Sequence, residues 1–449
     1  MGFEGTIDQF PEAQQSRDEL LARARQLAWY HSLRLDETFT TAGIFALDEF
    51  LPYYLLPGSL EGLRCLEVGT GNGYWSFQME ARGAGHVTAT DITDYSLTDF
   101  STIFGQPPLA TGPATPGAYG EPFRVAASLL DSRVEYRWSS VYDLSPSTMG
   151  THDLVFCGSM LMHLFGPFLA LQRIAGICRD TFLLTTLTAP SLDGEPLVVF
   201  KGHEISYVHF IPSPSCLAEM VRACGYERVL RGPTFMLRFR DRAANPDELP
   251  HTTLIAQKRV AGSRLSLAQP RALDTRERHA SIEVISAPRA VAPGVTFDVL
   301  VRVTNRAETT WHPPARDLAL ELDYEARLVT PRQASEWAPA ISGLPLVDYL
   351  PAHLSTVARL RIVAPTREGT FQIRPVVHQG RERFHGDTPA CAVEVTADAP
   401  PAHVPPGREG RLRDGLRGAA AFLEHRITTR WGWSDRYQKW RDRVRRLIR

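Results

Sequence analysis

The chain has 449 residues, of which 43% are hydrophobic and 22% charged, a length that suffices for about three domains. This composition is typical of globular proteins and excludes a wholly disordered, collagen-like or disulfide-scaffold chain. The formal net charge of −1 conceals an asymmetry: residues 1–260 carry 20 basic and 29 acidic side chains, whereas residues 407–449 carry 13 and 5. A polyanion would therefore bind the C-terminal segment in preference to the acidic body.

The cysteine pattern indicates a reducing compartment. The six cysteines show no CxxC spacing, and the N-terminus lacks the apolar core of a signal peptide. We therefore expect free thiols, no metal site and a cytoplasmic protein. Only three of the 49 basic residues are Lys, which indicates a GC-rich, bacterial coding sequence.

The first 260 residues alternate between helical and extended patterns. A helix is expected at 12–29, followed by strands and further helices. The expected strands cover residues 64–69, 86–91, 134–139, 153–158, 181–188, 226–230 and 252–258. The further helices cover residues 74–82, 165–178 and 215–224. This alternation predicts an α/β, Rossmann-like domain with a parallel, doubly wound sheet, and the Pro- and Gly-rich residues 105–122 predict a long loop that covers a site.

The segments after residue 260 differ from the first 260 residues in composition and in hydrophobic periodicity. Residues 261–279 form a polar linker, and residues 280–396 contain short alternating strands that predict an all-β sandwich. Residues 397–407 are a Pro-rich linker. Residues 408–449 predict a basic amphipathic helical tail that binds a membrane surface, associates with a second copy or docks on its own domains.

A glycine-rich stretch, LEVGTGNG at 66–73, lies where the first strand turns into a helix. Gly69, Gly71 and Gly73 let the backbone bend tightly and approach a ligand. Asp91 ends the next strand, where a carboxylate can accept both ribose hydroxyls. Enzymes that use NAD share this layout, but Glu67 would repel a pyrophosphate and attract the cationic amino-acid part of S-adenosylmethionine (SAM).

This arrangement resembles motif I of the class I SAM-dependent methyltransferases, and Asp91 matches their ribose-binding acid. The resemblance implies that the residues after the third strand contact adenine. The expected cofactor-binding residues are Glu67, Gly69, Thr70, Gly71, Asn72, Gly73, Asp91, Tyr142 and Asp143. A fold that has lost its ligand is the alternative.

A narrower resemblance rests on residues 29–31, 65–84, 153–171 and 208–229. These segments are similar to the bacterial tRNA wobble-uridine (5-oxyacetyl- or methoxyuridine) methyltransferases, whose best-known members use carboxy-SAM. Two departures argue against that cofactor. Met162 replaces the family's aromatic residue, and no lysine precedes residue 201 to hold the extra carboxylate. We therefore expect plain SAM and methyl transfer.

Several aromatic and histidine side chains are candidates for the acceptor side. A base within hydrogen-bond reach assists transfer to a hydroxyl, and His163 and His31 are the candidate catalytic residues. The candidate substrate-binding residues are Trp29, Tyr30, Tyr207 and His209. A structural role is the alternative for each single histidine.

The β-rich segment resembles the Ig-like module of polysaccharide-pathway proteins, on the pattern VLVRVTNRAETTW at 299–311 and the strands at 350–384. Trp311, Trp337 and Phe384 are candidates for stacking on sugar rings, or Trp311 and Phe384 fill the core.

Three functions are consistent with these features. The first is a methyltransferase, cytoplasmic or peripheral at the inner face of the membrane, that O-methylates a glycan, a lipid-linked saccharide or a small molecule. The second is a tRNA wobble-uridine enzyme, which the acidic body disfavours because tRNA binding needs basic side chains. The third is a non-catalytic binding or scaffold protein on a retired methyltransferase fold.

Overall fold

The computed structural model describes residues 15–93, 97–99, 120–201, 208–265, 267, 270–312 and 319–399. The expected tail at 408–449, nearly all of the linker at 397–407, most of the loop at 105–122 and Tyr207 therefore lie outside the described residues.

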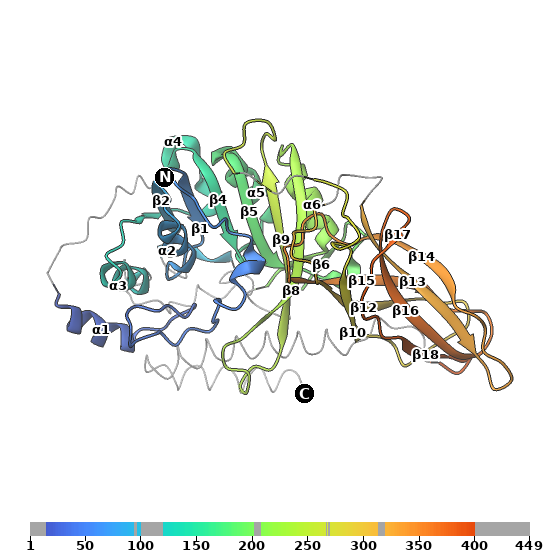
Figure 1. The fold of residues 1–449 in the computed structure, drawn as a ribbon. Helices are drawn as coiled ribbons and strands as arrows, with labels where there is room; N and C mark the ends of the chain where they lie inside the picture. The colour runs from blue at the N-terminus through green and yellow to red at the C-terminus, as the bar shows by residue number, and fades with distance from the viewer. Residues whose placement is uncertain are drawn as a thin grey trace.

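A seven-stranded sheet organises the N-terminal half (Figure 1), with the strand order β3-β2-β1-β4-β5-β9-β8. Its strands are β1 (Arg64–Val68), β2 (His86–Asp91), β3 (Glu135–Trp138), β4 (His152–Gly158), β5 (Cys178–Leu187), β8 (Arg228–Arg238) and β9 (Glu248–Gln257). The expectation of a wholly parallel sheet is wrong, because β9 pairs antiparallel with both β5 and β8. A short connection joins β8 directly to β9, and consecutive strands joined in this way pair as a hairpin.

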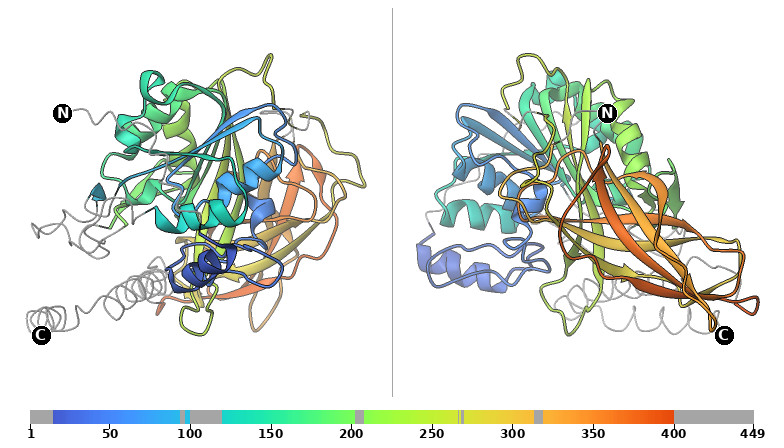
Figure 2. Two further views of the ribbon diagram at one scale, coloured as in Figure 1. Left: turned by 90° about the vertical axis from the view of Figure 1, so that its left-hand side faces the viewer. Right: turned by 45° about the vertical axis from the view of Figure 1, so that its right-hand side comes forward.

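Helices cover both faces of this sheet (Figure 2). One face packs against α1 (Arg17–Gln26), α2 (Tyr74–Ala81) and α3 (Glu121–Leu129), and the other against α4 (Pro146–Met149), α5 (Pro167–Ile177) and α6 (Pro214–Arg222). The 3-10 turns η1 (Leu51–Tyr54), η4 (Val141–Asp143), η5 (Leu161–His163) and η6 (Pro190–Leu192) join these elements. Helix α3 was not expected, because it follows directly on a Pro- and Gly-rich run.

The C-terminal β-domain consists of two sheets that share one core. Strands β10 (Ala280–Ser286), β12 (Thr296–Asn305) and β15 (Ser355–Val363) form the first sheet. The second contains β11 (Ala290–Val291), β13 (Leu320–Val329), β14 (Ala338–Pro345), β16 (Gly369–Gln379), β17 (Glu382–Arg383) and β18 (Cys391–Val395). Trp311 is fully buried and donates its indole N–H to the carbonyl of Glu277, and Phe384 packs edge-on against it. These two side chains therefore fill the core and are closed to sugars.

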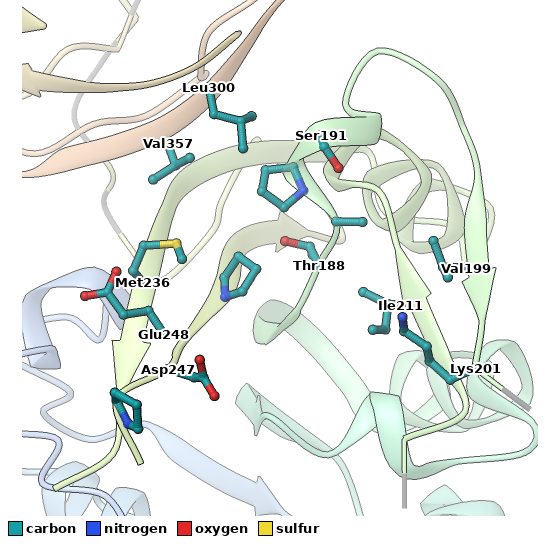
Figure 3. A pocket seen from close by; sticks show the side chains of 14 residues that line it. Thr188, Ser191, Val199, Lys201, Ile211, Met236, Asp247, Glu248, Leu300 and Val357 are labelled. Carbon is teal, nitrogen blue, oxygen red and sulfur yellow. The ribbon is translucent and has the colours of Figure 1, made fainter. Parts of the chain in front are cut away.

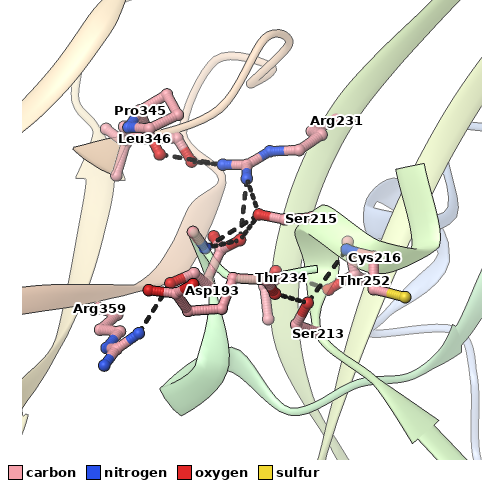
Figure 4. Close-up of polar contacts among 12 residues, drawn as sticks. Asp193, Ser213, Ser215, Cys216, Arg231, Thr234, Thr252, Pro345, Leu346 and Arg359 are labelled. Carbon is pink, nitrogen blue, oxygen red and sulfur yellow. Dashed lines mark hydrogen bonds and ion pairs between the residues drawn. The ribbon is translucent and has the colours of Figure 1, made fainter. Parts of the chain in front are cut away.

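A buried arginine joins the two domains (Figure 4). Arg231 on β8 donates to Asp193 Oδ1 at 3.0 Å and to the carbonyl oxygens of Pro345 and Leu346, also at 3.0 Å. From the other side, Arg359 of β15 donates to the carbonyl of Asp193 at 3.0 Å. The β-domain is thus fixed to the edge of the seven-stranded sheet by a charged, solvent-excluded contact, which we call the Arg231 clasp.

Replacing Arg231 with Ala removes the cationic partner of the Asp193 carboxylate, which keeps the neutral donors Ser215 Oγ and Gly194 N–H, and takes the guanidinium donor from two carbonyls. We expect a loss of about 2–4 kcal/mol in the free energy of unfolding, because buried polar groups lose their partner. Urea denaturation and limited proteolysis between the domains measure this. The control is Arg238→Ala on the same strand, whose ion pair with Glu49 is exposed and should contribute less than about 1 kcal/mol. Equally small losses in the free energy of unfolding of the two variants would contradict a stabilising role for the clasp.

Candidate functional site

The turn between β1 and α2 is shaped by its three glycines, which all have positive φ. A Cβ on Gly69 would lie 2.8 Å from the sulfur of Met160, and one on Gly73 would lie 2.5 Å from the Phe77 ring. A Cβ on Gly71 would meet no described atom within 4 Å. The outer glycines therefore permit close packing, whereas the middle one leaves open space where a ligand can approach the backbone.

Glu67 holds this turn from behind. Its side chain is 1% exposed, and Oε2 accepts hydrogen bonds from Thr70 Oγ1 at 2.8 Å, Ser76 N at 2.7 Å and Ser76 Oγ at 2.5 Å. Burial raises the pKa of Glu67 to about 8, while these three donors oppose the shift. Through Oε2, Glu67 fixes the turn and the start of α2.

Asp91 lies at the end of β2 beside the open side of the turn. Its Oδ2 accepts the N–H of Gly71 at 2.7 Å and its Oδ1 accepts the N–H of Ile92 at 2.8 Å. Burial raises the pKa of Asp91 to about 6, although both N–H donors oppose the rise. Each oxygen keeps a further lone pair, so the carboxylate can still accept hydroxyl groups.

Asn72 ties the turn to the N-terminal segment. It is 2% exposed, its Oδ1 accepts the N–H of His31 at 2.9 Å, and its Nδ2 donates to the carbonyl of His31 at 3.3 Å. The His31 ring packs against Tyr30 and Tyr74, and burial lowers its pKa to about 3. The structure thus places the neutral His31 and its neighbour Tyr30 beside the glycine-rich turn.

Trp29 requires a correction. It is 4% exposed, and its indole N–H donates to the carbonyl of Ala24 at 2.9 Å. The indole N–H and the ring of Trp29 are therefore both packed in the core at the end of α1. Trp29 is not placed to bind a substrate.

Tyr142 and Asp143 form η4 after β3, as the order of elements predicts. The Tyr142 hydroxyl donates to Asp99 Oδ2 at 2.5 Å and accepts the N–H of Gly166 at 3.1 Å. Asp99 also accepts the N–H of Phe165 at 2.5 Å. Tyr142 therefore joins the end of β3 to the start of α5, whereas Asp143 is exposed. Asp99 had not been singled out, because no motif surrounds it.

Three histidines lie near the carboxyl edge of the sheet. His163 ends η5 after β4, and His209 is 1% exposed, with its N–H donating to the carbonyl of Met162 at 2.9 Å. Neither ring nitrogen of His209 has a hydrogen-bond partner among the described residues. Burial lowers the pKa of His209, which favours the neutral form of the imidazole.

His251 is the histidine that sequence reasoning missed. It lies on β9 opposite Leu187 of β5, is 1% exposed, and its pKa is lowered to about 4 by burial and, to a lesser degree, by His163. Because β9 is antiparallel, its first residues reach the edge where the parallel strands end. Only the reversed direction of this strand, which the apolar pattern does not reveal, places His251 there.

The turn fits SAM by its chemistry. The open face at Gly71 lets the ligand approach the backbone, and Asp91 can accept ribose hydroxyls. Within the described ranges, no group of three or more His, Cys, Asp or Glu side chains is arranged to hold a metal ion. Among the same residues, no helix combines the length and apolarity needed to cross a membrane.

Substitutions of Asp91 and Glu67 distinguish cofactor binding from structural support of the glycine-rich turn. Asp91→Ala should weaken binding of S-adenosylhomocysteine (SAH) at least tenfold with little change in melting temperature, because both of its described donors are backbone N–H groups of half-buried residues. Glu67→Ala should lower the melting temperature as well, because it removes an acceptor shared by three buried donors. Calorimetric titration and thermal unfolding measure the two effects. A melting temperature lowered equally in both variants would contradict this division.

Cofactor binding should depend on pH through Asp91. With a pKa near 6, the carboxyl group becomes protonated as the pH falls below 6 and loses acceptor capacity. We expect SAH affinity to fall by roughly tenfold per pH unit below pH 6. Titration calorimetry across this range measures the profile, and Asp91→Asn should give a weak, flat profile over the same range.

Methyltransferases are among the known proteins that are similar to this chain. No protein-family model matches the chain. The chain is 30% identical over 182 positions to the ubiquinone biosynthesis O-methyltransferase of Bordetella avium. The aligned region covers 38% of this chain and 65% of that protein. The chain thus matches slightly less than two thirds of that protein's length.

Solved structures with a similar fold include the N-terminal domain of EvdMO1 in the presence of SAH and D-fucose, at 17% identity and a TM-score of 0.39. The match covers 55% of this chain and 98% of that one. Magnesium protoporphyrin IX methyltransferase from Synechocystis PCC 6803, with bound SAH, matches at 16% identity and a TM-score of 0.32, over 47% of this chain and 82% of that one.

The strand order, the glycine-rich turn and the O-methyltransferase relative point in the same direction. The N-terminal half has a Rossmann-like fold with a glycine-rich turn, and the chain is similar over 182 positions to an O-methyltransferase.

Proposed function

We propose that the chain transfers the methyl group of SAM to an oxygen atom of a small hydroxylated acceptor, such as a saccharide, in the cytoplasm. The observation that carries the proposal is the open backbone at Gly71 beside the Asp91 carboxylate. The similarity to an O-methyltransferase of Bordetella avium favours oxygen as the acceptor atom.

SAM, when bound, supplies an electrophilic methyl group. The protein positions the acceptor in line, excludes water and receives the hydroxyl proton as the O–CH3 bond forms and the S–CH3 bond breaks. His163 follows β4 at the carboxyl edge of the sheet, close enough to His251 to affect the pKa of that histidine. We assign His163 to the role of proton acceptor, with His31 and Tyr30 as the groups that close the cofactor end.

The same assay distinguishes this function from the tRNA-modifying and scaffold functions. Purified protein is incubated with SAM and a panel of sugar and phenolic acceptors, and release of SAH is measured. Turnover of a small acceptor that is abolished by Asp91→Ala supports the proposal. Salt-sensitive turnover of unmodified tRNA alone would replace it with the wobble-uridine function, and SAH binding without turnover of any acceptor would favour a retired fold.

Histidine substitutions test the proton acceptor. His163→Ala should lower kcat by about 10²–10⁴-fold, because a general base is lost, with SAH affinity unchanged. The matched control is His86→Ala, because His86 lies at the opposite edge of the sheet and pairs with Glu135. Steady-state kinetics over pH 6–9 measure both variants, and an equal effect of the two substitutions would remove His163 from the reaction.

A further inference from the structure

A cavity of about 270 Å³ lies between the two domains (Figure 3). The catalytic domain contributes Thr188 and Ser191, which follow β5, and Lys201, which follows β6 (Val198–Phe200). The C-terminal β-domain contributes Leu300 of β12 and Val357 of β15. Neither domain alone encloses this space.

The cavity adjoins the reactive edge of the sheet. The backbone N–H of Lys201 donates to the carbonyl of His209 at 2.9 Å, and the N–H of His209 donates to the carbonyl of Met162, next to His163. The His209 ring packs against Phe165, whose own N–H binds Asp99 near Tyr142. A continuous set of contacts therefore runs from the cofactor end of the site to the wall of the cavity.

The lining predicts the chemistry of the ligand. Most of the wall is aliphatic, and the Lys201 ammonium points into the hollow with no ion-pair partner among the described residues. Asp247 lies across the cavity, whereas the Glu248 carboxylate points away from it. A cation with an aliphatic surround favours a ring that carries a carboxylate or phosphate, because an anion satisfies the lysine and the ring fills the apolar space.

The Arg231 clasp keeps both walls in place. Arg231 and Arg359, which hold the domains together, are 8% and 7% exposed. The clasp includes Asp193, two residues beyond the lining residue Ser191, and Thr234 N donates to Thr356 Oγ1 at 3.0 Å beside Val357. The β-domain is therefore positioned as a fixed part of the site and not as a tethered module.

We propose that this interdomain cavity is the acceptor pocket, that it takes a single hydroxylated ring bearing a carboxylate or phosphate, and that the β-domain forms one of its walls. The assignment rests on the proposed function, since it names the acceptor of the same site. Lys201 binds the acidic group, and Leu300 and Val357 set the size of the ring.

The full-length protein saturated with SAH is titrated with D-glucuronate and 3,4-dihydroxybenzoate, and with their neutral counterparts D-glucose and catechol. We expect one of the two acids to bind at least tenfold more tightly than its neutral counterpart, and the preferred pair distinguishes a sugar acid from a phenolic acid. Lys201→Met should abolish this preference and leave SAH affinity unchanged.

Steric variants test the β-domain wall. Leu300→Trp should weaken binding of the preferred acid at least tenfold, because the indole enters the cavity. The control is Val363→Trp on the same face of the neighbouring strand, where the side chain is 57% exposed; this variant should bind as the wild type does. Thermal unfolding checks the fold of each variant, and Lys201→Met keeps the test valid should Leu300→Trp be unstable.

The outcomes separate the two proposals. SAH binding without any preference for an acid, or a preference that survives Lys201→Met, overturns the pocket assignment alone. Undiminished binding to a folded Leu300→Trp variant overturns the role of the β-domain. Failure of the wild type to bind SAH overturns the proposed function instead.

Discussion

The carboxylate of Glu67 is the interaction on which the site depends. Three donors converge on one oxygen of this buried side chain, and they belong to both ends of the glycine-rich turn. The turn in turn presents the N–H of Gly71 to Asp91 and the amide of Asn72 to the N-terminal segment. A single buried acid thus sets the relative positions of β1, β2, α2 and residues 29–31.

The catalytic sheet and the site edge could be predicted from the sequence because both follow local rules. Apolar runs separated by helical spacing locate the strands, and a glycine turn between a strand and a helix locates the ligand. The pattern did not reveal that Glu67 Oε2 accepts three internal hydrogen bonds, or that the Trp29 indole donates to a carbonyl near the end of α1. Both sets of hydrogen bonds depend on which polar group lies nearest in the folded chain.

Long-range placement explains the remaining differences. His251, Asp99 and Lys201 carry no motif, and they reach the site through the reversed strand β9, the bonds to Tyr142 and the contact with His209. The pairing of Arg231 with Asp193 and with carbonyls more than a hundred residues away is equally invisible in the sequence. Such contacts depend on tertiary packing, which spacing along one chain does not encode.

Strand β8 is the last strand of the catalytic sheet, and its outer side would otherwise present unpaired amide and carbonyl groups. The β-domain satisfies several of them: Asp348 N–H and Tyr349 N–H donate to the carbonyl of Arg231, and Arg231 N–H donates to Asp348 Oδ2. An exposed strand edge is a template for pairing with other chains. The second domain therefore also shields the first from edge-to-edge aggregation. Without the second domain, β8 would need a different edge to avoid pairing with other chains.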